Sequence, residues 1–114
     1  MLPKKFRITV ERFNQIPQKS KDYGYIFLKF KVKKSENPFP RFVFVVPKYL
    51  DKRSSTRHLT KRIIEELVRE KITGIKYPMN FLIKPQKIIF KTDRPKVNEE
   101  LDNLFEKINS SWKK

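Results

Sequence analysis

The sequence contains no cysteine, only two glycines and one histidine, and it has no long apolar run. The lack of cysteine excludes disulfides, thiolate nucleophiles and Cys-based zinc sites, so a cytoplasmic location is expected. The apolar runs fall short of the roughly 18 residues of a spanning helix, so no membrane association is expected. With Gly24 and Gly74 alone, the chain lacks a glycine-rich phosphate loop, and its carboxylates form no catalytic pair or metal-ligand pattern. We therefore expect no catalytic side chains and no protein-held metal ion.

What the chain does contain is positive charge. Its 114 residues include 28 Lys and Arg against 12 Asp and Glu, a formal net charge of +16. Such an excess repels itself in the folded state and indicates a polyanionic partner. An apolar fraction of 38% with ten Phe predicts one globular domain over residues 1–114. Residues 95–114 carry four bases and four acids, so the binding surface is expected upstream of them.

The apolar pattern predicts an α+β fold, in which helices pack on a single sheet. We expect a basic arm over residues 1–8, a helix over 10–16 and a loop over 18–24. Strands over 25–32 and 41–46 follow, and then a helix over 56–71 that ends near Gly74. A strand over 80–84, a candidate further strand over 87–90 and a last helix capped by Asn98 complete the chain. Residues 110–114 are expected to fray.

The first predicted strand has two different faces. One set of alternating side chains is apolar and the other is mixed, namely Ile26, Leu28, Phe30 and Val32 against Tyr25, Phe27, Lys29 and Lys31. The apolar set belongs in a core. The mixed set combines rings for base stacking with charge for phosphate, as single-stranded nucleic acid requires. The same rings could equally pack beneath the short helix and touch Phe13, and both interpretations stay open.

The segment from residue 48 to residue 69 is the second candidate site. Its basic side chains lie before the predicted helix and opposite its apolar stripe of Leu59, Ile63, Ile64 and Leu67; they are Lys48, Lys52, Arg53, Arg57, Lys61, Arg62 and Arg69. A helix N-terminus, capped here by Ser55 or Thr56, offers backbone N–H groups to phosphate. A solvated helix with i,i+4 ion pairs would show the same pattern. The net charge favours RNA contact, and His58, which has no catalytic partner by spacing, joins this surface.

Four segments together resemble the bacterial ribonuclease P protein component. They are Pro3-Lys4-Lys5-Phe6-Arg7-Ile8, Arg41-Phe42-Val43-Phe44-Val45-Val46-Pro47-Lys48-Tyr49, Arg57-His58-Leu59-Thr60-Lys61-Arg62, and the strand ending at Lys84-Pro85. The departures from the family pattern are His58 for Asn, Leu59 for Arg, Val43 for Gly, Pro47 for Ser and Pro17 for an aromatic. The chain therefore resembles a divergent member of the family.

The resemblance implies a fold shared with a ribosomal-protein domain, a single-sheet sandwich with a β-α-β crossover. It implies a protein subunit that binds the catalytic RNA subunit and the 5′ leader of precursor tRNA, with no obligate protein partner. Mg²⁺ would be held by the RNA subunit and substrate, where hydrolysis occurs. The family's helix bases correspond to Arg57, Lys61 and Arg62, and its cleft aromatic to Phe13. A ribosomal or other structural RNA-binding protein on the same fold is the alternative, because fold alone does not separate the two.

Overall fold

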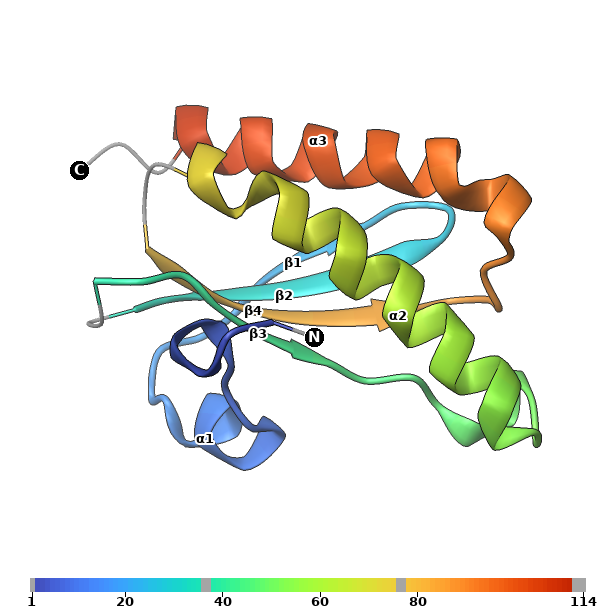
Figure 1. Ribbon diagram of the computed structural model, residues 1–114. Helices are drawn as coiled ribbons and strands as arrows, with labels where there is room; N and C mark the ends of the chain where they lie inside the picture. The colour runs from blue at the N-terminus through green and yellow to red at the C-terminus, as the bar shows by residue number, and fades with distance from the viewer. Residues whose placement is uncertain (1, 36–37, 76–77, 112–114) are drawn as a thin grey trace.

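The structure is a computed structural model of the chain and describes residues 2–35, 38–75 and 78–111. Within these residues, a four-stranded sheet has the order β1-β2-β4-β3 (Figure 1). Its strands are Lys21–Gly24 (β1), Leu28–Lys34 (β2), Arg41–Phe44 (β3) and Met79–Pro85 (β4). The helices Ser54–Lys71 (α2) and Arg94–Ser111 (α3) cover one face, and the short helix Val10–Gln15 (α1) lies on the other side. Single 3-10 turns span Lys4–Phe6 (η1), Lys48–Leu50 (η2), Ile72–Gly74 (η3) and Lys91–Asp93 (η4).

The strand pairing confirms the predicted α+β sandwich with its β-α-β crossover. β1 and β2 form an antiparallel hairpin, and β2 pairs antiparallel with β4. β3 and β4 are parallel, so the chain must cross from one end of the sheet to the other between them. α2 makes this crossover and packs on the same face of the sheet as α3 (Figure 1).

The core lies between the sheet and the two long helices. Alternate β2 residues Leu28, Phe30 and Val32 point into it and are at most 1% exposed. Phe42 of β3 stacks on Phe81 of β4 with ring centroids 4.8 Å apart. The helices contribute aliphatic side chains at helical spacing: Ile63, Ile64, Leu67 and Val68 from α2, and Val97, Leu101, Leu104 and Ile108 from α3. None of the described helices is long and apolar enough to cross a membrane.

The β1–β2 hairpin differs from the prediction. β2 begins at Leu28 because Tyr25 donates its backbone N–H to the Leu28 carbonyl at 2.9 Å and closes a tight turn. Ile26 lies in this turn with 72% of its surface exposed, so its predicted place in the core is wrong. Residues 21–24, predicted as loop, form β1 instead. Their polar sequence carries no alternation, and backbone pairing with β2 alone places them in the sheet.

Several predicted element ends are also wrong. α3 begins at Arg94 and not near Asn98, because Pro95 is tolerated in a first turn, where its missing N–H loses no hydrogen bond. Residues 87–90 form no strand, and β3 ends two residues before residue 46. The predicted frayed tail is helical through Ser111, and residues 112–114 lie outside the described part of the chain.

The predicted basic arm is docked along β3. Arg7 forms a parallel β-bridge with Phe42, and Ile8 donates its N–H to the Phe42 carbonyl at 3.0 Å. Leu2 and Ile8 are buried. Phe6 meets Phe39 edge to face with ring centroids 5.8 Å apart. The arm therefore extends the packed structure, while its charged side chains remain at the surface.

Candidate nucleic-acid interface

The sheet face turned away from α2 and α3 is basic. Alternation along β2 and β4 places four side chains at its centre, Lys29, Lys31, Leu82 and Lys84, which we call the open sheet face. They line a surface groove of about 420 Å³ together with β1 residues. Lys29 lies directly opposite Lys84 in the register. Like charges in this position destabilise a sheet, and a bound polyanion would remove the repulsion.

Lys33 attaches α1 to one end of this face. Its side chain is 8% exposed, and its Nζ donates to the carbonyls of Phe13 at 2.9 Å and Ile16 at 3.1 Å. The same ammonium lies 4.7 Å from the Phe13 ring centroid. A six-residue helix is too short to be stable alone, and a cation at its C-terminal carbonyls stabilises it. Lys33 thus fixes the position of α1 beside the open sheet face.

The aromatic residues of the predicted leader cleft do not lie together. Phe13 is 1% exposed and packs on Lys33. Phe27, the residue just before β2, is 7% exposed and belongs to the core at the other end of that strand. Six residues of extended chain separate Lys33 from Phe27, about 20 Å. Tyr25 packs edge-on against Phe30 on the helix-covered side, where burial raises the pKa of its phenol. A single groove wall made of Phe13 and Phe27 is therefore not formed.

Of the predicted cleft, the structure brings together the two lysines, Lys29 and Lys31. Their roles in RNA binding stay predictions. Two further cations of the sheet were missed, Lys84 opposite Lys29 and Arg41 near α1, although the sequence held a signal for each. Lys84 alternates with the buried Ile83, and Arg41 opens the next strand, where its Nε donates to Asn80 Oδ1 at 3.0 Å.

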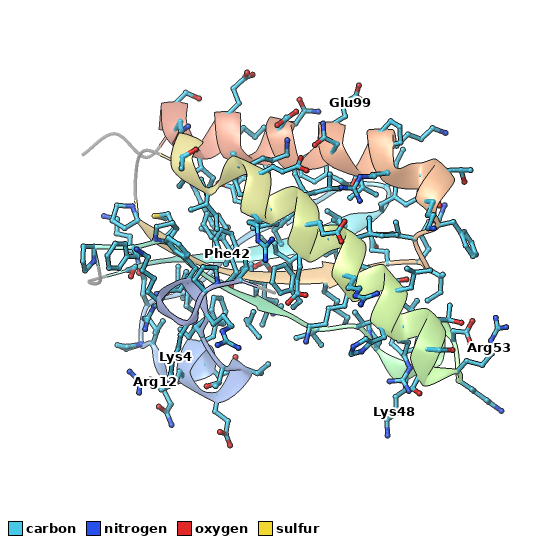
Figure 2. All side chains as sticks on the ribbon, viewed as in Figure 1. Lys4, Arg12, Phe42, Lys48, Arg53 and Glu99 are labelled. Atoms are coloured by element: carbon cyan, nitrogen blue, oxygen red, sulfur yellow. The ribbon has the colours of Figure 1, made fainter. Side chains whose placement is uncertain are left out.

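The basic residues predicted on α2 and in the loop before it lie around the N-terminal half of that helix, except Arg69, which lies in its last turn. Lys48 and Arg53 project outward at the N-terminal end (Figure 2). The exposed members of the group are Lys48, Lys52, Arg53, His58, Arg62 and Arg69, while Arg57 and Lys61 are half-buried. We call this group, with Arg57 and Lys61, the α2 basic surface. Arg53 pairs with Asp51 at 2.9 Å, and this contact holds the pKa of the Asp51 carboxyl below its usual range.

The N-terminus of α2 has free hydrogen-bonding capacity. The predicted caps Ser55 and Thr56 lie inside the helix, and Arg53 occupies the N-cap position without a side-chain hydrogen bond. The first turn contains no acidic residue. Backbone N–H groups at such a terminus are suited to phosphate oxygens, and the positive end of the helix dipole adds to their attraction.

The buried stripe of α2 includes Thr60 and not Leu59. Thr60 is fully buried, and its Oγ1 accepts the N–H of Ile89 at 3.2 Å. Leu59 is 36% exposed and lines a shallow depression with His58 and Arg62. Its predicted place in the apolar stripe is wrong: the buried face of α2 runs at helical spacing through Thr60, Ile64 and Leu67, and the Ile89 N–H satisfies the Thr60 hydroxyl there. The two departures from the family signature, His58 and Leu59, are thus both at the surface.

Most acidic residues lie away from the open sheet face, although Asp22 of β1 lines its groove opposite Lys31. Eight of the twelve Asp and Glu lie in α2, η4 and α3. Among them, Glu66 pairs with Arg94 at 3.0 Å, Asp102 with Lys71 at 2.6 Å, and Glu99 projects outward from α3 (Figure 2). Within the described residues, no three His, Cys, Asp or Glu are placed to hold a metal ion. The positive charge of the described surface is thus concentrated on the open sheet face and on the α2 basic surface.

Comparison with known proteins identifies the family. The chain is similar in structure to the RNase P protein from Thermotoga maritima, with a TM-score of 0.72, 21% identity, and coverage of 90% of this chain and 96% of that chain. It is also similar to the Staphylococcus aureus RNase P protein, with a TM-score of 0.70, 15% identity, and coverage of 95% and 98%. A search of curated protein sequences finds no significant match. The sequence model of the family described as Ribonuclease P matches residues 2–109. The chain therefore belongs to the ribonuclease P protein family and has the fold of its bacterial members.

Proposed function

We propose that this chain binds both the catalytic RNA subunit of ribonuclease P and the 5′ leader of precursor tRNA, and thereby promotes 5′ maturation of tRNA. Family membership makes it a ribonuclease P protein subunit. The observation that supports the finer assignment is the presence of two separate basic surfaces on one small domain. The α2 basic surface lies at the start of a helix, and the open sheet face lies on the opposite side of the sheet.

The shapes of the two surfaces suit different RNA partners. The α2 basic surface presents a helix N-terminus and the half-buried Arg57 and Lys61. Groups held in fixed positions in this way suit the phosphates of a folded RNA subunit, which are themselves held in fixed positions. The open sheet face is a groove lined by three lysines together with Leu82, Tyr23 and Asp22. An extended single strand can lie along such a groove with its phosphates at the lysines. We assign the RNA subunit to the first surface and the leader to the second.

Catalysis in this proposal takes place outside the protein. Mg²⁺ would be held by the RNA subunit and substrate, where it would activate water and stabilise the leaving oxygen. The protein's residues would contribute positive potential and orientation, and His58 would act as a surface contact. We further propose that the complex works in the cytoplasm, away from membranes, without an obligate protein partner.

The proposal is tested with purified chain, the RNA subunit from the same organism and precursor tRNA. The protein alone should cleave nothing, and its addition to the RNA subunit should accelerate 5′ cleavage at low Mg²⁺. Robust cleavage by the protein without RNA would overturn the proposal, as would absence of any stimulation. A structural RNA binder of the ribosome would instead copurify with ribosomal particles and leave cleavage unchanged.

A further inference from the structure

β3 leads into α2 and β4 leads into α3 at the same end of the sheet (Figure 1). The residues of these connections line a further groove. Its volume is about 650 Å³, and we call it the end groove. The side chains that matter to its chemistry are three rings and three charged groups: Phe27, Tyr49, Phe90, Lys87, Asp93 and Lys96. None of these residues belongs to the open sheet face or to the α2 basic surface.

Two rings of the end groove are unusually exposed. Tyr49 is 76% exposed and Phe90 is 57% exposed, more than any other aromatic side chain in the described part of the chain. Single exposed apolar residues are common on protein surfaces and need no explanation. Two aromatic rings that line one groove beside cations form a patch, and such patches mark binding sites.

The floor of the end groove is held rigidly. Phe27 is 7% exposed, and its backbone N–H donates to the carboxylate of Glu100 at 3.0 Å. The Leu28 N–H donates to the same carboxylate at 3.1 Å, and Gln86 donates its N–H to the Phe27 carbonyl at 2.8 Å. Glu100 is itself buried, so this connection between the hairpin turn and α3 is shielded from water. A ligand would therefore meet a preformed floor and lose little entropy in ordering it.

The charges around the end groove favour an anion. Lys87 Nζ lies 4.9 Å from the Phe27 ring centroid, and Lys96 is exposed at the groove margin. The carboxylate that lines the groove, Asp93, accepts the backbone N–H of Phe90 at 3.0 Å and so serves the turn. Lys84 of the open sheet face lies 5.9 Å from the Tyr49 ring centroid, which makes it the link between the two grooves.

We propose that the end groove is a further RNA-binding site, in which unstacked bases of a single strand stack on Tyr49 and Phe90 while Lys87 and Lys96 contact the adjoining phosphates. This combination of rings and cations is what sequence-tolerant binding of single strands requires. The strand that crosses the open sheet face continues past Lys84 into the end groove. The inference rests on the proposed function in taking RNA as the ligand. A second copy of the chain is a poorer occupant, because two molecules of charge +16 repel each other.

The test compares binding of two short single strands to the purified chain, an unstructured adenine-rich RNA and a strand of equal length with abasic positions. Y49A combined with F90A should weaken binding of the base-containing strand about 5- to 100-fold. Binding of the abasic strand and the salt dependence of affinity should not change, because no cation is removed. Y49F combined with F90Y keeps both rings and should bind as the unaltered chain does.

Two controls separate stacking from charge and from ring loss elsewhere. K87Q combined with K96Q should weaken both strands alike and lower the salt slope by about one unit per lost contact. F39A removes a ring that is 37% exposed, packs on Phe6 and lies outside the end groove. It should leave the affinities for both strands unchanged. Thermal stability is measured for every variant, and Y49A alone provides a milder change at the most exposed ring.

An unchanged affinity in the double ring variant would overturn the inference, and so would an equal loss for both strands or an equal loss in F39A. A shift of sedimentation mass in the variant Y49A combined with F90A, with RNA affinity unchanged, would show that the rings make a contact between copies of the chain. That result would also overturn the inference. The assay contains neither the RNA subunit nor precursor tRNA. If the end groove does not bind RNA, stimulation of precursor cleavage can still be observed. If instead the proposed function is wrong, that stimulation is absent while the affinities for the two short strands are unaffected.

Discussion

Replacement of Lys33 by methionine is expected to release α1 from the sheet. The substitution keeps the apolar stem but removes the ammonium that donates to the carbonyls of Phe13 and Ile16 and lies over the Phe13 ring. Hydrogen bonds from a charged donor contribute about 1.5–3 kcal/mol each, and a cation–π contact contributes about 0.5–2 kcal/mol. The desolvation of the buried ammonium offsets part of this sum, so the net loss should be about 2–3 kcal/mol.

A loss of this size is measurable in two ways. For a domain of this length, each kcal/mol should lower Tm by roughly 3–5 °C, so K33M should lower it by roughly 6–15 °C. Amide hydrogen exchange should accelerate first in Val10–Gln15 (α1), because a short helix without its C-terminal anchor opens locally. K31M is the matched control, since Lys31 lies on the same strand and the same face but is exposed. Unchanged exchange in α1 together with an unchanged Tm would refute the role of Lys33.

Further predictions concern α2, Thr60 and Tyr25. R57Q combined with K61Q should weaken binding of the RNA subunit and lower its salt slope by about one unit per lost contact. K107Q combined with K113Q should have little effect. Equal salt slopes for the two pairs in a filter-binding titration would exclude the α2 basic surface as the binding site of the RNA subunit. T60V should lower the free energy of unfolding by about 1–2 kcal/mol in urea, because it leaves the Ile89 N–H without its partner at 3.2 Å, while T60S should retain most of the stability. Y25F should keep or slightly raise stability, because the buried Tyr25 hydroxyl has no hydrogen-bond partner among the described residues. Since burial raises the pKa of this phenol, the unfolded chain ionises first, and stability should fall as the pH rises above about 10; Y25F should remove part of that decline in a pH series of urea titrations.

The alternation of β2 could be interpreted from sequence, because a strand buried on one face repeats every second residue. Leu28, Phe30 and Val32 are in the core as predicted. The same pattern failed at its N-terminal end, where it extends through Tyr25 and Ile26 although the chain turns there. Alternation reports which side chains are apolar and carries no information on where the backbone reverses. The Tyr25–Leu28 hydrogen bond closes the turn, and hydrogen bonds to Glu100 and Gln86 hold it against distant segments. Phe27 therefore lies in the core and not in the predicted cleft.

The partner of a buried polar group could not be predicted either. Thr60 is buried with its hydroxyl bonded to Ile89, 29 residues further along the chain, whereas Leu59 is exposed. Lys33 follows the predicted strand directly, and nothing in the sequence indicates that α1 ends beside its ammonium. Both positions depend on contacts between distant segments, which neither composition nor periodicity contains. The order of elements and the charge of the α2 basic surface are local properties, and those were accessible.

The assignment of the leader to the open sheet face is tested most directly by comparing two affinities of the reconstituted RNA–protein complex, one for precursor tRNA and one for tRNA without a leader. The variant is K29Q combined with K31Q and K84Q, which removes the three lysines of that face and no residue of the core. At roughly 0.5 kcal/mol for each exposed contact, affinity for precursor tRNA should fall about tenfold. Affinity for leaderless tRNA should not change, because the α2 basic surface is intact. An equal fall for both substrates, or no fall for precursor tRNA, would contradict the assignment.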